Sequence, residues 1–172
     1  MSLVRKSAVN AAIVSVIAGL SLGAANAATV SQSVTVEGSP SKVWAMIGPF
    51  CSIQHWLPPV GTCKQDHDQY PTRTLVTKDG SATFVERLVD RDDFKHFYSY
   101  TFVSSPLPVT DYTSTIWVTS IGHGQSSVTW RGTYTPLPGK ESAAREALDG
   151  IYAAGLDSIR TKTLQQVARA AP

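Results

Sequence analysis

Apolar and polar residues alternate with a period of two through most of residues 60–135, and this period is typical of strands with one buried face. Turn-forming residues divide the stretch into segments of strand length. The predicted turns are residues 69–71, 78–80, 91–93, 104–111 and 122–124. The pattern therefore predicts an antiparallel meander of about six strands.

A strand and two short helices precede the meander. Residues 29–37 have the composition of a strand, and Pro40 falls near the position where a first helical turn accepts proline. Residues 43–47 give that helix one apolar side, and residues 50–56 predict a second helix. Both helices are expected to be short, because Gly-Pro and Pro-Pro pairs interrupt helical geometry after them.

The C-terminal segment changes to a helical period after the turn at residues 136–139. Apolar residues then recur at spacings of three and four, which predicts a helix about 40 Å long. Its predicted inner face comprises Ala144, Leu148, Ile151, Tyr152, Gly155, Leu156, Ile159 and Leu164. We expect an α+β fold in which a curved antiparallel sheet of about seven strands wraps around this long helix.

The first 27 residues have the pattern of a cleaved signal peptide. Basic residues precede an apolar run over residues 8–23, and Ala25 and Ala27 supply the small residues that a signal peptidase recognises. An uncleaved anchor is the alternative, but a run of about 16 mostly small residues is short for a bilayer that needs about 20. We therefore predict a signal peptide over residues 1–27, one domain over residues 28–172, and a soluble protein that is periplasmic or secreted.

The charge balance argues against nucleic-acid binding. The chain has 15 Lys and Arg residues against 13 Asp and Glu residues. Arg5 and Lys6 are two of the 15 and lie in the predicted signal peptide, so the remainder carries 13 basic against 13 acidic residues. Recognition of nucleic acid needs a concentrated basic surface, and the sequence has no run of Lys or Arg. No second apolar segment reaches spanning length, so no stable membrane insertion is expected after cleavage.

Cys51 and Cys63 are the two cysteines of the chain. Two thiols 12 positions apart in an oxidising compartment predict one local disulfide. Such a bond closes a small loop and would stabilise the fold by roughly 3 kcal/mol. A reactive cysteine near His55 is the alternative, but exported free thiols tend to oxidise and nothing in the sequence orients the imidazole.

Several local sequences occur in an order and spacing known from one superfamily. They are residues 39–44 (SPSKVW), 56–58 (WLP), 86–88 (ERL) and 105–108 (SPLP), followed by Tyr112. Together they resemble the SRPBCC or START-like helix-grip superfamily, which includes birch-pollen-allergen-like proteins, polyketide cyclases and plant hormone receptors. The resemblance covers nearly all of residues 29–168 and implies the helix-grip fold. It specifies function poorly, because one fold hosts many chemistries.

Polar side chains fall on the strand face that is predicted to point inward. Within residues 82–90, Glu86 alternates in phase with Phe84 and Leu88, although a one-residue slip of the strand would exchange its two faces. The next predicted strand, residues 94–102, has aromatic residues in phase. The candidate ligand-binding residues on these and adjoining elements are Glu86, His96, Tyr98, Tyr100, Tyr112, Trp130 and Tyr152. Apolar side chains with a few polar tips are typical of small-molecule pockets.

Glu86 offers the most chemistry in this set. Desolvation would raise the pKa of an inward-facing carboxyl. The carboxyl could anchor a ligand, or it could act as general acid or base with Tyr98 or Tyr112, as the resemblance to polyketide cyclases implies. The structural alternative is that Glu86 pairs with a cation while the tyrosines line a rim with their hydroxyls in water.

The sequence contains no pattern that predicts a metal or cofactor site. The four histidines are dispersed, and neither a His-Glu-x-x-His nor a Cys-x-x-Cys spacing occurs. A nucleophile elbow and a phosphate-binding glycine loop are also missing. We therefore predict no metal, no cofactor and no firm catalytic residue, with Glu86 as the candidate if the protein is an enzyme.

We interpret the chain as an exported protein that binds a small hydrophobic or amphipathic ligand in a cavity between the sheet and the C-terminal helix. An aromatic, polyketide-like or lipid-like molecule would suit the predicted lining. The first alternative is a cyclase or dehydratase type of enzyme, a lyase or isomerase. The second is a periplasmic accessory protein that acts through its surface, as some relatives associated with methanol dehydrogenase imply.

Overall fold

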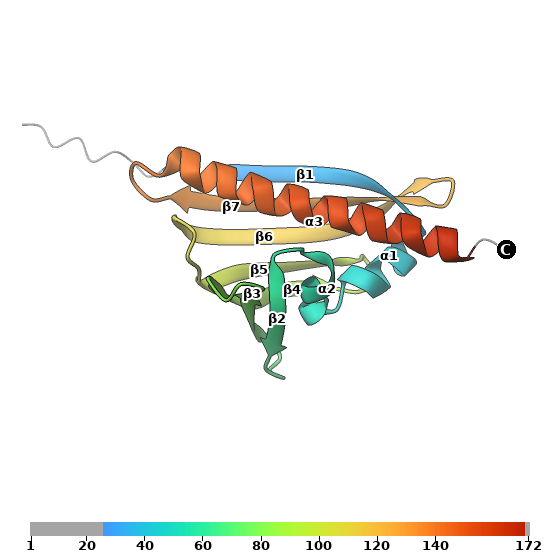
Figure 1. Ribbon diagram of the computed structural model, residues 1–172, viewed down its shortest axis with the longest axis horizontal. Helices are drawn as coiled ribbons and strands as arrows, with labels where there is room; N and C mark the ends of the chain where they lie inside the picture. Colours follow the sequence, from blue (N-terminus) through green and yellow to red (C-terminus); the bar gives the residue numbers. More distant parts are fainter. Residues whose placement is uncertain (1–25, 171–172) are drawn as a thin grey trace, which may run out of the picture.

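The computed structural model describes residues 26–170, so nearly all of the predicted signal peptide lies outside the described residues. The elements are β1 (Ala28–Glu37), α1 (Pro40–Ile47), η1 (Phe50–Ser52), α2 (Ile53–Trp56), β2 (Val60–Gln65), β3 (Thr72–Thr77), β4 (Thr83–Asp92), β5 (Phe97–Ser104), β6 (Val109–Gly122), β7 (Gln125–Pro136) and α3 (Glu141–Ala170). The seven strands form one antiparallel sheet in the order β1-β7-β6-β5-β4-β3-β2. The predicted α+β helix-grip fold is confirmed, with α3 running along the sheet and the short helices at one end (Figure 1).

Strand β7 shows why one face of the sheet is apolar. Val128, Trp130, Gly132 and Tyr134 are buried, whereas the residues between them are exposed or half-buried. This strand pairs with β1 on one side and with β6 on the other. Because side chains alternate along every strand, the buried residues of the three strands join into one inner surface.

The C-terminal helix α3 covers that inner surface. Its buried residues are Ala144, Leu148, Tyr152, Gly155, Leu156, Ile159 and Thr163. The prediction that Leu164 belongs to the inner face is wrong, since this side chain is 51% exposed. Residues 164–170 are all exposed, so the final turns of α3 have no buried face that could continue the apolar period. Among residues 26–170, no helix is both long and apolar enough to cross a membrane.

The segment between β1 and β2 packs against one end of the sheet. Its predicted second helix is divided into the 3₁₀ turn η1 and the single helical turn α2. Phe50, Ile53 and Trp56 of this segment are buried. The predicted disulfide is present: Cys51 in η1 is bonded to Cys63 in β2, with 5.5 Å between the Cα atoms. The bond ties this segment to an edge strand of the sheet.

The turn between β4 and β5 lies further along the chain than the sequence predicts. Strand β4 continues to Asp92, and the turn occupies residues 93–96. The backbone N–H of Phe94 donates to Oδ1 of Asp92 over 2.9 Å, which fixes the turn here. Phe94 is 98% exposed, and His96 has a left-handed backbone with φ of 56°. The sequence predicts both as inner strand residues, because Phe94 and His96 continue the alternation of the strand that follows them.

Candidate functional site

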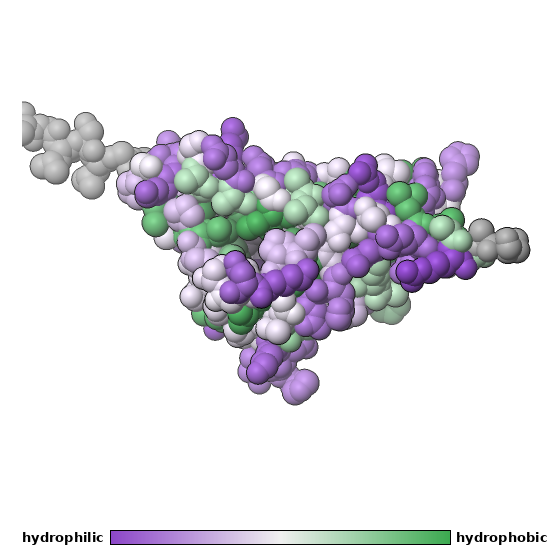
Figure 2. Space-filling view, viewed as in Figure 1, coloured by the Kyte–Doolittle hydropathy of each residue, from purple (hydrophilic) through white to green (hydrophobic). Residues whose placement is uncertain are grey.

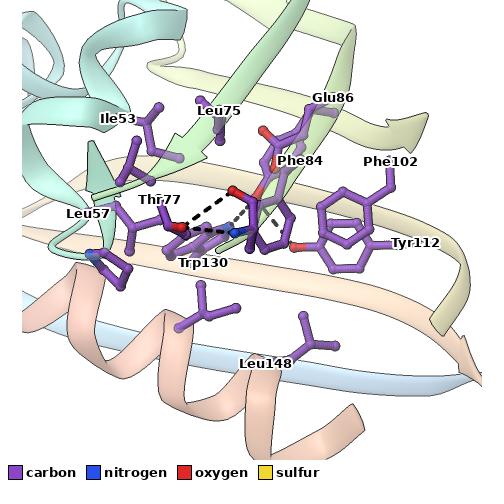
Figure 3. Close-up of a pocket in the computed structure, with 15 residues that line it drawn as sticks. Ile53, Leu57, Leu75, Thr77, Phe84, Glu86, Phe102, Tyr112, Trp130 and Leu148 are labelled. Atoms are coloured by element: carbon purple, nitrogen blue, oxygen red, sulfur yellow. Dashed lines mark hydrogen bonds between the residues drawn. The ribbon is translucent and has the colours of Figure 1, made fainter. Parts of the chain in front are cut away.

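A pocket of about 120 Å³ lies between the inner face of the sheet, the α2 segment and α3. Its apolar walls are formed by Ile53, Leu57, Pro59, Val60, Leu75, Ala82, Phe84, Phe102, Leu148 and Ile151. Its polar lining residues are Thr77, Glu86, Tyr100, Tyr112 and Trp130. Figure 3 shows Leu148 on the helix facing the side chains of the strands across this space. The surface of the molecule is also hydrophobic below α3, beside the part that carries β2 and β3 (Figure 2).

Glu86 points into the interior, as the sequence predicts. The residue is 4% exposed, and its neighbours in phase, Phe84 and Leu88, are half-buried and buried. Arg87 and Val89 are exposed on the opposite face. Strand β4 therefore directs the predicted face inward, and the one-residue slip that would exchange its two faces is absent.

Arg73 on β3 is the counterion of Glu86. The two residues lie directly opposite each other in the β3–β4 register, and Nε of Arg73 donates to Oε2 of Glu86 over 2.6 Å. Nη1 of Arg73 donates to the backbone carbonyl of Phe50, and the guanidinium carbon lies 3.9 Å from the centroid of the Phe50 ring. Nη2 is the one fully buried side-chain nitrogen or oxygen without a hydrogen-bond partner in residues 26–170.

The electrostatics of this pair follow from its burial. Desolvation raises the pKa of Glu86, while the charge of Arg73 and its hydrogen bond oppose that rise. Desolvation acts to lower the pKa of Arg73, but the charge of Glu86, the hydrogen bond to it and the neighbouring Tyr98 and Tyr100 together outweigh desolvation, so the pKa is raised. A guanidinium does not lose its proton in proteins, and a buried cation is stable only beside an anion. The pair is therefore ionic and neutral overall.

Hydroxyl groups behind the pocket form a chain of hydrogen bonds. The hydroxyl oxygen of Tyr112 lies 3.3 Å from that of Tyr100 and 2.8 Å from that of Tyr152. The Tyr152 hydroxyl in turn lies 2.6 Å from Oγ of Ser114. Nε1 of Trp130 donates to Ser114 over 2.9 Å and to Tyr100 over 3.2 Å. The buried hydroxyls are thus all hydrogen-bonded, as interior polar groups must be.

Two glycines allow α3 and β7 to approach closely at this point. The rings of Trp130 and Tyr152 are stacked, with centroids 4.2 Å apart and an interplanar angle of 8°. A Cβ atom at Gly132 would lie 2.5 Å from the Tyr152 hydroxyl oxygen, and one at Gly155 would lie 2.8 Å from the Trp130 ring. Glycine at these two positions is therefore what lets the tyrosine of the helix reach the hydroxyls of the sheet.

Burial raises the pKa of each tyrosine in this region. The pKa values of Tyr98 and Tyr152 lie above the usual 10, and those of Tyr100 and Tyr112 lie well above it. In every case desolvation is the largest cause. The phenols are therefore neutral at physiological pH and act as hydrogen-bonding groups.

Four of the seven predicted ligand-binding residues line the pocket, namely Glu86, Tyr100, Tyr112 and Trp130. Tyr152 lies behind them, hydrogen-bonded to Tyr112. Tyr98 is buried but packs elsewhere, with its ring centroid 5.6 Å from that of Phe50. His96 lies in the β4–β5 turn with Nε2 3.4 Å from Oγ of Ser41, so the structure does not bring it to the pocket.

The sequence analysis missed Arg73 and most of the apolar lining. Arg73 is in phase with Leu75 on the buried face of β3, and this phase was the available signal. The alternative that pairs Glu86 with a cation is correct. The part of that alternative that places the tyrosines at a rim is wrong, because Tyr98, Tyr100, Tyr112 and Tyr152 are all buried.

The lining has few groups that could hold a charged cofactor. Glu86 is the one charged side chain among the lining residues, and Arg73 already neutralises it. Over the described part of the chain, no cluster of three or more His, Cys, Asp or Glu side chains could hold a metal ion. The arrangement is chemically that of an apolar pocket with one acidic, hydrogen-bonding wall.

A protein family described as "Polyketide cyclase / dehydrase and lipid transport" matches residues 27–163. The chain belongs to this family. Membership confirms the resemblance to the SRPBCC helix-grip superfamily, and this family is associated with the binding of small hydrophobic molecules. A comparison with curated proteins found no match.

Several solved structures superpose well on the chain. The protein XoxI from Bacillus cereus is 36% identical, with a TM-score of 0.75 over 80% of this chain and 96% of that one. A protein from Bacillus thuringiensis is 35% identical, with a TM-score of 0.75 over 80% and 99% of the two chains. The Zhui aromatase/cyclase from Streptomyces sp. R1128 has a TM-score of 0.68 over 83% and 96%, and at 17% identity it shows the shared fold alone.

Proposed function

We propose that this family member is an exported binding protein that holds a small hydrophobic molecule in the pocket between the sheet and α3. The observation that carries the proposal is the pocket itself, in which ten apolar residues surround five polar ones. A concave, mostly apolar site with a few placed polar groups is the usual form of a small-molecule site.

The volume of the pocket limits what it can hold. Pockets for drug-sized ligands measure about 300–1,000 Å³, whereas a cavity of about 150 Å³ binds benzene. The pocket of about 120 Å³ therefore matches a molecule with one ring or a short branched chain. Of the ligand classes suggested by the sequence, a single-ring aromatic molecule is favoured over a polyketide or a lipid chain.

Binding is favoured over cyclase or dehydratase catalysis by the state of the polar groups. Oε2 of Glu86 accepts a hydrogen bond from Arg73, which stabilises the carboxylate and opposes proton donation by it. The Tyr112 hydroxyl is hydrogen-bonded to two other tyrosines, and Tyr98 does not line the pocket. A general acid would need a proton that is free to move toward the guest.

Export is part of the proposal and is supported by two features. Residues 1–27 have a signal-peptide pattern, and both cysteines of the chain are joined in a disulfide. Mass spectrometry of the protein recovered from its own cell envelope and medium tests this point. We expect the mass of a chain whose first residue is Ala28. A full-length protein in the cytoplasm would contradict export.

Binding is tested with toluene as the probe, by calorimetric or NMR titration of the purified protein. Ile151 lines the pocket and is half-buried, so Ile151→Phe should fill the space and weaken toluene binding at least tenfold. Ile121 is 48% exposed and does not line the pocket, so Ile121→Phe is the matched control and should bind like the wild type. A wild type that binds neither toluene nor its hydroxylated analogue phenol, or toluene binding that survives Ile151→Phe, would refute the proposal.

A further inference from the structure

The direction of each hydrogen bond behind the pocket can be deduced from the donors that the side chains possess. Oγ of Ser114 lies 3.0 Å from the backbone carbonyl of Arg131, and a carbonyl only accepts, so the single Ser114 proton points there. The Tyr152 hydroxyl must therefore donate to Ser114. Tyr112 must then donate to Tyr152, and Tyr100 to Tyr112.

This order uses every phenolic proton that borders the pocket. Tyr100 and Tyr112 both direct their O–H groups along the chain, away from the space for a guest. The N–H of Trp130 is shared between Ser114 and Tyr100. The remaining lining hydroxyl, that of Thr77, donates to Oδ1 of Asp79 over 2.6 Å. The polar side chains of the pocket thus have no donor to spare.

An acceptor, by contrast, is available on Glu86. Oε2 is bonded to Arg73, and Oε1 makes no hydrogen bond to the described residues. Arg73 Nη2 is the one fully buried and unpartnered polar side-chain atom in those residues, so Oε1 retains accessible surface. Glu86 lines the pocket and Arg73 does not, so this surface of the carboxylate faces the guest and the guanidinium lies behind it.

Charge balance favours a guest that is neutral. The Arg73–Glu86 pair is neutral overall, and both partners are buried. An ammonium guest would leave one uncompensated positive charge in the interior, and a carboxylate guest would leave a negative one beside Glu86. Either charge would have to be desolvated, which costs far more than burying a hydroxyl that is hydrogen-bonded.

We propose that the guest is neutral and donates one hydrogen bond to Oε1 of Glu86, so that the pocket takes single-ring phenols or alcohols and rejects carboxylates and ammonium ions. This inference rests on the proposed function, because it names the ligand class of the same pocket. The Arg73–Glu86 pair then acts as a fixed, neutral acceptor whose geometry is set by the two strands.

Four single-ring probes test the inference on the purified protein near neutral pH. They are phenol, toluene, benzoate and benzylamine, titrated separately by calorimetry or NMR. We expect phenol to bind at least as tightly as toluene, although its hydroxyl must be dehydrated, because a hydrogen bond to a charged acceptor compensates that cost. We expect benzoate and benzylamine to bind at least tenfold more weakly than phenol.

A double variant tests whether Glu86 is the acceptor. Arg73→Leu/Glu86→Leu removes the pair together and leaves neither charge unpaired, which keeps the interior foldable. We expect the ratio of phenol to toluene affinity to fall about tenfold or more in this variant. Asp157→Ala/Arg160→Ala removes an exposed ion pair on α3 and is the matched control, in which the ratio should not change.

The outcomes separate this inference from the proposed function. Toluene binding with phenol bound tenfold more weakly, or benzoate or benzylamine bound as tightly as phenol, would overturn the ligand class and leave the binding pocket in place. Failure of all four probes on the wild type would overturn both. If the double variant does not fold, the affinities of the wild type for the four probes test the ligand class by themselves.

Discussion

Arg73 and Glu86 are direct cross-strand partners on β3 and β4, and both side chains point into the protein interior. The fold thus holds a buried ion pair between two strands near the β2 edge of the sheet, next to an apolar pocket, with 2.6 Å between Nε and Oε2. Such a pair costs desolvation energy that an apolar pair would avoid. Its position beside the pocket accords with a role in recognising a guest.

We predict a strongly non-additive effect of replacing the two residues. Arg73→Leu leaves a buried carboxylate unpaired, and Glu86→Leu leaves a buried guanidinium unpaired, so each should lower the free energy of unfolding by about 3–5 kcal/mol. The double variant should recover most of that loss. Urea unfolding curves of the four proteins measure these values, and single effects that simply add would contradict the ionic state of the pair.

The fold was predictable from sequence because its signals are local. Alternation along β7 and turn residues between strands depend on neighbours in the chain, and so does the helical period of α3. The sequence-based predictions were wrong where a residue continues the periodic pattern but lies beyond the packed part of its strand or helix. Phe94 continues the alternation but lies on an exposed turn, and Leu164 continues the helical period where α3 has no buried face.

The site was only partly predictable because it depends on pairing between strands. The inward direction of Glu86 follows from its own strand, whereas its partnership with Arg73 requires the β3–β4 register. The exclusion of Tyr98 from the pocket likewise depends on Phe50, which packs against its ring from a different element. A single sequence carries no direct signal for such long-range contacts.

Replacement of Tyr152 should destabilise the protein through unsatisfied partners. Tyr152→Phe removes the acceptor of the Tyr112 proton and the donor to Ser114, while the ring still stacks on Trp130. We expect a loss of about 1–3 kcal/mol in the free energy of unfolding. Tyr70 is 55% exposed, so Tyr70→Phe should change it by less than about 0.5 kcal/mol. Equal effects of the two substitutions in urea unfolding would contradict the hydrogen-bond chain.

Stability should fall at alkaline pH because buried tyrosines have raised pKa values in the folded state. Between the unfolded pKa near 10 and the higher folded pKa values of Tyr100 and Tyr112, the folded protein binds more protons than the unfolded chain. Their contribution is therefore fully present below pH 10 and is lost as the pH rises toward the folded values.

Ultraviolet absorbance of tyrosinate, followed together with circular dichroism during an alkaline titration, measures this coupling. The tyrosines with raised pKa values, Tyr98, Tyr100, Tyr112 and Tyr152, should ionise only in the same transition that unfolds the protein. Ionisation of these four tyrosines near pH 10 without unfolding would show that their phenols are accessible.

Reduction of the disulfide should weaken both the fold and the pocket. Cys51 and Cys63 join η1 to β2, and the lining residues Ile53 and Val60 lie within three positions of them. Loss of the bond frees a small loop in the unfolded chain and should lower the free energy of unfolding by about 3 kcal/mol. Because the bond also holds one wall of the pocket, toluene affinity should decrease in the reduced protein.

The variant Cys51→Ser/Cys63→Ser should behave like the reduced wild type and should not respond further to reductant. Equal unfolding curves for the oxidised and reduced proteins would mean that packing of Phe50, Ile53 and Trp56 alone holds this segment against the sheet.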